Sequence, residues 1–134
     1  MALNADRDTP ARKGAVREAP VAANTIIYAG GMTAITTAGV ARPPSAASDI
    51  VLGRSRERAD NATGADGDVS VDIEAGTFRY ANSAGGDEIT RAHIGDDCFA
   101  VDDERVARTN GGSSRPRAGS VFDVDALGVW VKSD

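Results

Sequence analysis

The clearest pattern of hydrophobic and polar positions lies in the middle of the chain. Three β-branched residues there, Val69, Val71 and Ile73, alternate with polar residues. A period of two places successive side chains on opposite faces of a strand, so this segment predicts a strand with one buried and one solvated face. An Ala-Gly turn follows, and residues 77–81 resume the apolar pattern. We therefore expect the two segments to pair as a hairpin.

Short apolar runs separated by turn residues continue along most of the chain. Further strands are expected at residues 25–28, 32–36, 40–42, 49–58, 98–101, 106–108, 118–124 and 129–132. The first three favour a meander, and the last four favour two more hairpins, across short polar loops. Only Thr90–Ile94 suggests a helical turn. The pattern predicts an all-β fold, a small β-barrel or sandwich of short antiparallel strands.

The N-terminal segment differs from the rest because it has no periodic apolar pattern. Four basic and three acidic side chains give residues 1–19 a charge of +1, which leaves −6 for the rest of a chain whose total is −5. Such a segment predicts an extended N-terminal arm over residues 1–19, before a single β-rich domain over residues 20–134. The arm is either a passive tail or a segment that orders on a partner, and composition does not decide between them.

Composition indicates a lean hydrophobic core. Aromatic residues make up only 4% of the chain, so Val, Ile, Leu and Ala must supply most of the buried surface. The 15 glycines and 5 prolines are scattered, which fits many turns between short strands. A monomer with such a core is expected to be marginally stable, and docking on a partner or on further copies would stabilise it.

Charge excludes some classes of partner. The net charge of −5 comes without a basic cluster of the size that nucleic-acid binding needs. A local basic run does occur: Arg54, Arg56 and Arg58 share one face of a predicted strand, either as a solvated face or as a contact for an acidic protein surface. No stretch has transmembrane length, and the N-terminus lacks the apolar core of a signal peptide. We expect no nucleic-acid or membrane partner, and assembly in a reducing cytoplasm.

Residues that could carry catalysis or hold a metal do not form a recognisable set. His93 is the one histidine, and the sequence does not bring a serine and an aspartate to it. Cys98, the one cysteine, lies in an apolar run and is expected to be a buried thiol. The acidic clusters lack the spacing of a calcium loop, since aspartates are also common in turns. We expect no enzyme activity, no catalytic residue, no metal site and no cofactor.

Several segments of the chain, taken together in their order, form a recognisable series. The series comprises residues 59–61, 64–67, 69–73, 76–83, 89–95, 98–103, 118–125 and 128–131. It resembles small proteins encoded beside the major capsid protein in Mu-like and other siphovirus-type phages and prophages, over residues 20–134. The resemblance implies a capsid decoration (cement) protein that binds the outside of the expanded capsid, often as a trimer at threefold or quasi-threefold positions. The resemblance does not assign a catalytic role to any residue of this chain.

The implied partners are the phage major capsid protein and further copies of this chain in a homotrimer. The implied location is the exterior of the virion capsid, after assembly in the cytoplasm of a bacterial host. The expected contact residues are the arginines of the arm, the basic run, and a tryptophan that faces away from its apolar neighbours: Arg7, Arg12, Arg17, Arg54, Arg56, Arg58 and Trp130. Tryptophan is enriched among residues that dominate binding energy at interfaces.

Two alternatives stay open. The chain could be a head–tail joining or tail structural protein, which would also be β-rich and non-enzymatic. It could instead be a β-barrel that binds a small ligand or a glycan. Exposed aromatic side chains would indicate glycan binding, and Trp130 is the strongest candidate among them.

Overall fold

The computed structural model describes residues 2, 4–10, 12 and 14–133. Within this part of the chain the protein is all-β, as predicted, with two short 3-10 turns. The strands are β1 (Val16–Pro20), β2 (Thr25–Ile27), β3 (Met32–Ile35), β4 (Ala41–Arg42), β5 (Ile50–Ser55), β6 (Ala59–Asn61), β7 (Ser70–Glu74), β8 (Thr77–Tyr80), β9 (Asp97–Ala100), β10 (Val106–Ala107), β11 (Arg117–Asp125) and β12 (Gly128–Lys132). The 3-10 turns are η1 (Gly85–Asp87) and η2 (Arg91–His93). The latter confirms the helical turn expected at Thr90–Ile94.

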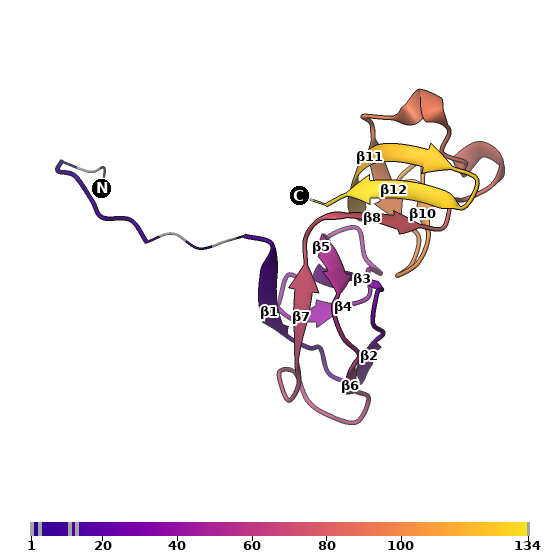
Figure 1. Cartoon of the computed structure of the whole chain (residues 1–134). Helices are drawn as coiled ribbons and strands as arrows, with labels where there is room; N and C mark the ends of the chain where they lie inside the picture. Colours follow the sequence, from indigo (N-terminus) through magenta and orange to yellow (C-terminus); the bar gives the residue numbers. More distant parts are fainter. Residues whose placement is uncertain (1, 3, 11, 13, 134) are drawn as a thin grey trace.

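The described strands form three antiparallel sheets stacked as layers (Figure 1). The central sheet has the order β1-β7-β5-β3-β4, and the C-terminal sheet has the order β10-β9-β11-β12-β8. A small sheet pairs β2 with β6. None of the three closes on itself, so of the two predicted architectures the sandwich is correct and the closed barrel is wrong.

The central sheet contributes side chains to two separate cores, one on each of its faces. On one face, Met32, Ala34 and Val51 pack with side chains of the C-terminal sheet. On the other face, Val71 and Ile73 pack with residues around the small sheet. Strand β3 shows the consequence directly, because three successive residues from Met32 to Ala34 are all buried. A strand covered on both sides needs a continuous apolar or small-residue run rather than an alternating one.

Strand β7 confirms the clearest expectation from the sequence. Val71 and Ile73 are buried, whereas Ser70 is exposed and Asp72 is half-buried. Two predicted hairpins are also confirmed, since β9 pairs with β10 and β11 pairs with β12. In the expected meander, β3 pairs with β4, but β2 pairs with β6 rather than with β3.

The predicted hairpin between residues 68–74 and 77–81 is wrong. Strand β7 pairs with β1 and β5 in the central sheet, whereas β8 pairs with β12 in the C-terminal sheet. The chain crosses between layers at Gly76, where the Ser133 N–H donates to the Gly76 carbonyl at 2.9 Å. The Gly76 N–H in turn donates to the Ser133 hydroxyl at 2.8 Å. These contacts join residues 57 positions apart, so the local turn signal could not reveal them.

The long strand expected at residues 49–58 is also wrong, because β5 ends at Ser55 and the next strand, β6, begins only at Ala59. The chain bends at Arg56 and Glu57, and the Ser55 hydroxyl donates to the Glu57 carbonyl across this bend. Arg54, Arg56 and Arg58 therefore do not share one strand face. Within β5, Val51 is buried and Ile50 is 62% exposed.

The boundary of the N-terminal arm needs a correction. Residues 16–19, assigned to the arm from composition, belong to β1, which pairs with β7 from Val16↔Glu74 to Pro20↔Ser70. Ala19 is buried in the core beside the small sheet. The described residues before β1 extend away from the body, and every one of them is exposed (Figure 1). The arm is therefore shorter than predicted, and β1 is the edge of the central sheet.

Candidate protein-binding surface

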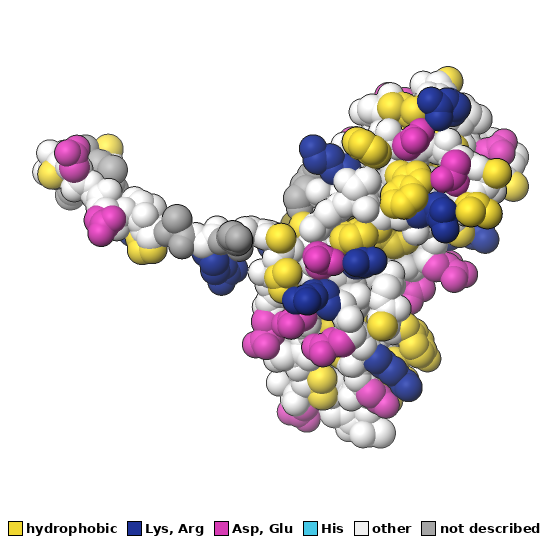
Figure 2. All heavy atoms as spheres, in the orientation of Figure 1, with side chains coloured by type: hydrophobic (Ala, Val, Ile, Leu, Met, Phe, Trp, Pro, Cys, Tyr) yellow, Lys and Arg dark blue, Asp and Glu magenta, His cyan; other side chains and the backbone are white. Residues whose placement is uncertain are grey.

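Three arginine side chains lie over aromatic rings on one face of the molecule. Each guanidinium carbon lies within 6 Å of a ring centroid, the range of a cation–π contact. The pairs are Arg54 over Phe78 at 4.1 Å, Arg58 over Tyr28 at 5.6 Å and Arg79 over Trp130 at 5.5 Å. We call these six residues the aromatic–arginine face. Figure 2 shows hydrophobic and basic side chains gathered together on this side, over β5, β8 and β12.

Trp130 reaches this face through the alternation of β12. Its neighbours Val129 and Val131 are buried, so the indole points out of the core, as its sequence context predicted. The indole N–H donates to a carboxylate oxygen of Asp125 at 2.9 Å. This bond, followed by the backbone N–H groups of the β11–β12 turn, holds the pKa of Asp125 below its ordinary value. The ring is thus fixed in orientation while one side remains accessible.

Arg54 is held between a carboxylate and a ring. Its guanidinium donates to a carboxylate oxygen of Glu74 at 3.1 and 3.3 Å, and the two residues are directly opposite on β5 and β7. Phe78 packs against the core below, while Arg54 covers its other side. The Arg54 side chain is still 45% exposed, so its charge remains available to a partner.

Arg58 and Tyr28 extend the face towards the small sheet. Arg58 lies 4.0 Å from an Asp60 carboxylate oxygen and remains largely exposed. Arg56 lies beside them at the bend after β5. Within the described part of the chain its guanidinium makes no ion pair and no hydrogen bond. An arginine without a carboxylate partner is the side chain most ready to bind one from another molecule.

Three open hollows surround this face and meet at Gly30. Their volumes lie between about 380 and 470 Å³. Arg54 and Arg56 line one, Phe78 and Trp130 line another, and Arg79 lines two of the three. All three open to solvent and combine charged side chains with aromatic edges. Arginine and aromatic residues are the types enriched in protein–protein interfaces, so this surface suits a protein partner better than an enclosed small ligand.

The seven contact residues expected from the sequence fall into two groups. The structure brings Arg54, Arg58 and Trp130 together on the aromatic–arginine face, with Arg56 beside them. Arg7 and Arg12 lie on the exposed arm, and Arg17 lies on β1. Arg17 lines a different hollow, beside Ile50 and Arg117.

Sequence reasoning missed Tyr28, Phe78 and Arg79 as members of the face. The only available signal was their position in short strands next to polar residues. That signal does not show which ring meets which arginine, because each pair joins residues that are far apart in the sequence.

The residues considered for catalysis are not brought together. His93 lies on the surface at η2, where its Nδ1 accepts the Thr90 N–H at 2.9 Å. Cys98 is fully buried, and that burial raises the pKa of its thiol to about 12. Among the residues that the structure describes, no three His, Cys, Asp or Glu side chains are grouped so as to hold a metal ion.

None of the described helical turns is long or apolar enough to cross a membrane. Comparison of the chain with protein-family models, with curated proteins and with solved structures gives no match.

Proposed function

We propose that this protein is a capsid decoration protein, which binds the outer surface of an expanded tailed-phage capsid and stabilises it. The observation that carries the proposal is the aromatic–arginine face. It offers exposed arginines and a fixed tryptophan, without an enclosed pocket or a convergent catalytic set on the described surface. Such a surface can recognise another protein and does not require chemistry.

Two further features support an assembly role. The body is small and layered, and the chain before β1 extends away from it as an exposed arm (Figure 1). An arm and a compact body together can contact more than one neighbour on a lattice. Many weak contacts of this kind act together because each raises the effective concentration of the next. The resemblance to proteins encoded beside the major capsid protein points to the same role, with the chain acting as a homotrimer on the capsid exterior.

The direct test is co-sedimentation of the purified chain with expanded capsids of the phage that encodes it, followed by cryo-EM of the pellet. Ordered density on the capsid exterior would support the proposal and give the number of copies at each site. Density only at the neck or along the tail would favour a head–tail joining or tail protein instead. Absence of binding to any particle would contradict a virion role and favour the ligand-binding alternative.

Replacing Trp130 tests whether the aromatic–arginine face makes the contact. We expect Trp130→Ala to weaken capsid binding by about tenfold or more, because truncating a central tryptophan typically costs an interface about 2 kcal/mol or more. Trp130→Phe keeps a ring beneath Arg79 and serves as the matched variant that retains most binding. The thermal unfolding of each variant is measured in parallel. A loss of stability without a specific loss of binding would show that Trp130 only holds the β11–β12 turn.

A further inference from the structure

The outer edge of β1 is an unoccupied pairing site. Two hydrogen bonds fix the pattern: the Val21 N–H donates to the Val69 carbonyl at 2.8 Å, and the Ala75 N–H donates to the Ala15 carbonyl at 2.7 Å. Because antiparallel strands alternate, the backbone groups of residues 17 and 19 also point towards β7. Those of Val16, Glu18 and Pro20 point outwards. Just beyond β1, Val21 forms an isolated parallel bridge with Ala41 of β4, and the Ala22 N–H donates to the Ala41 carbonyl at 2.9 Å. No strand among the described residues pairs with the outward groups of Val16 and Glu18.

The same edge carries two carboxylates that lack a counter-charge. Glu18 and Asp72 are directly opposite on β1 and β7, at a position between the hydrogen-bonded pairs, where side chains approach most closely. Like charges in this arrangement destabilise a sheet. Neither carboxylate forms an ion pair with any residue that the structure describes, and neither accepts a hydrogen bond from a described side chain. The edge therefore favours a strand that brings positive charge.

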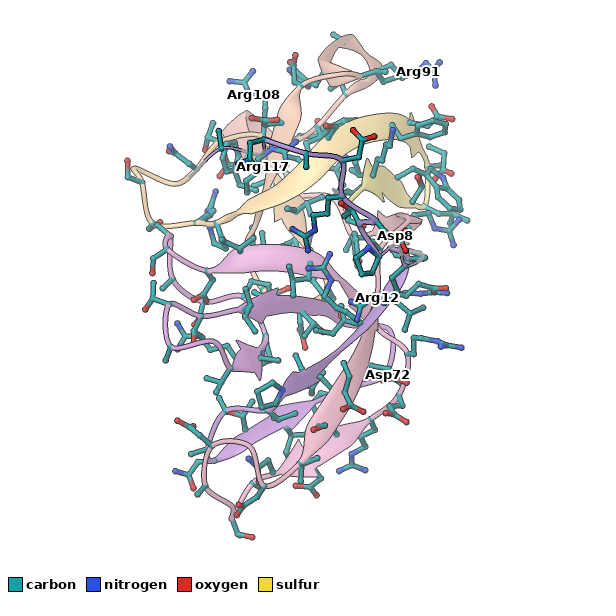
Figure 3. All side chains as sticks on the ribbon, turned by 90° about the vertical axis from the view of Figure 1, so that its left-hand side faces the viewer. Asp8, Arg12, Asp72, Arg91, Arg108 and Arg117 are labelled. Carbon is teal, nitrogen blue, oxygen red and sulfur yellow. The ribbon has the colours of Figure 1, made fainter. Side chains whose placement is uncertain are left out.

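The arm of the chain has the chemistry that this edge lacks. It carries Arg7 and Arg12, both exposed, and its one described backbone hydrogen bond is local, from the Thr9 N–H to the Arg7 carbonyl. Its own β1 edge is poorly placed to receive it, since Ala15 is held against β7 and the chain then leaves the body. Figure 3 looks along the direction in which the arm departs and shows Asp72 on that side of the molecule. A segment of fourteen residues would span roughly 45 Å if fully extended, which is enough to reach a neighbour.

We infer that the arm of one copy pairs, as an added strand, with the outer edge of β1 in a second copy. Backbone hydrogen bonds to Val16 and Glu18 supply the affinity, and an arginine of the arm neutralises the Glu18–Asp72 pair. The two carboxylates and Pro20 also explain the selectivity, because charged residues and proline on an edge strand discourage pairing with other strands. This inference goes beyond capsid binding and is tested without capsids.

The test is sedimentation velocity of the full chain at low salt over a range of concentrations. The decisive variant is Glu18→Pro, which removes an outward N–H but no bond to β7, and Pro20 shows that β1 accepts proline at such a position. We expect the wild type to associate. We expect Glu18→Pro to raise the dissociation constant by about tenfold or more, as the loss of an interface hydrogen bond and the added ring predict. Circular dichroism checks that the fold is retained.

A second set of variants keeps the result interpretable if Glu18→Pro fails to fold. Glu18→Arg should weaken association, and combining it with Arg12→Glu should restore it in part. Glu104→Arg, at an exposed position between β9 and β10 of the C-terminal sheet, is the matched control and should leave association unchanged. A wild type that stays monomeric at all concentrations, or a Glu18→Arg variant that associates as well as the wild type, would overturn the inference. Either result would leave the capsid-binding proposal untouched, because co-sedimentation with capsids tests that proposal separately.

Discussion

At the scale of single residues, Asp49 shows how a buried charge organises the chain before β5. Its carboxylate is almost fully buried and accepts two hydrogen bonds from Arg42, at 2.9 and 3.1 Å. The backbone N–H groups of Ser45 and Ala46 donate to the same carboxylate at 3.0 and 3.1 Å. A buried carboxylate is tolerated only when it is paired and hydrogen-bonded in this way. These bonds fix the Pro-rich segment between β4 and β5.

The environment of Asp49 predicts acid sensitivity. Burial alone would raise its pKa, but the bonds from Arg42, Ala46 and Ser45 outweigh that effect and hold the pKa below the ordinary 3.8. A carboxylate with a lowered pKa in the folded state stabilises the protein above its unfolded pKa. That contribution should be lost as the pH falls below about 3.8, through the lower pKa of the folded state.

Urea unfolding at pH 6 and at pH 2.5 measures this contribution. Asp49→Asn should lower the free energy of unfolding at pH 6 by about 1–3 kcal/mol, the range for hydrogen bonds to a charged group. It should also reduce the difference between the two pH values. Asp66→Asn is a control, because Asp66 is exposed and accepts one backbone bond. An unchanged pH dependence in Asp49→Asn would contradict the assignment.

At the scale of elements, the contact between β5 and β7 depends on Gly53. Its φ of +149° lies in a region that other residues rarely adopt, and a Cβ there would lie 2.1 Å from the Glu74 carbonyl oxygen. The strands therefore approach more closely than any side chain at position 53 would allow. This approach places Arg54 opposite Glu74, so it also sets one arginine of the aromatic–arginine face.

Gly53→Ala should accordingly be strongly destabilising. The strain of the backbone and the displacement of β7 together predict a loss of about 2–4 kcal/mol in the free energy of unfolding. Gly86→Ala is the matched control, since no atom lies within 4 Å of the Cβ that it would add. Chemical denaturation of both variants checks the prediction. Equal stability would show that β5 and β7 can separate without loss.

At the scale of the whole molecule, two cores share one sheet. The central sheet packs against the C-terminal sheet on one face and against the small sheet on the other. Loss of a strand from the central sheet therefore weakens the layer that both cores use. Strand β1 is at the edge of this layer, and its Ala19 lies in the core beside the small sheet.

Two N-terminal deletions should separate the arm from the body. Removing residues 2–14 should leave the unfolding temperature unchanged, because the described side chains of that segment are exposed. Removing residues 2–19 also removes most of β1 and should lower the free energy of unfolding by about 3 kcal/mol or more, through lost ladder bonds and burial. The composition of residues 1–19, which assigned this whole segment to the arm, predicted that neither deletion would unfold the body. Differential scanning calorimetry distinguishes them, and equal melting of both proteins would contradict a structural role for β1.

The sequence by itself determined which segments are strands wherever one face of the strand is exposed to solvent and the other is buried. Val71 and Ile73, the β9–β10 and β11–β12 hairpins, and the outward Trp130 follow from alternation and nearby turns, which act over a few residues. Alternation failed at β3, where three successive residues are buried. It also does not show which face of β5 is buried, because Ile50 is exposed whereas the small residues Gly53 and Ser55 are buried. It also failed for the arm, since charged residues conceal a short edge strand.

Only the tertiary structure decided which strands pair and which side chains meet. The local sequence at Ala75–Gly76 predicts a hairpin turn. In the structure Gly76 is hydrogen-bonded to Ser133, and β8 pairs in another sheet than β7. The aromatic–arginine face joins side chains of the central and C-terminal sheets with Tyr28 and Arg58, which flank the strands of the small sheet. The outer edge of β1 is unpaired at Val16 and Glu18 among the described residues. The physical reason is the same in each case. Propensity and alternation are local, whereas sheet order depends on contacts between residues far apart in the chain.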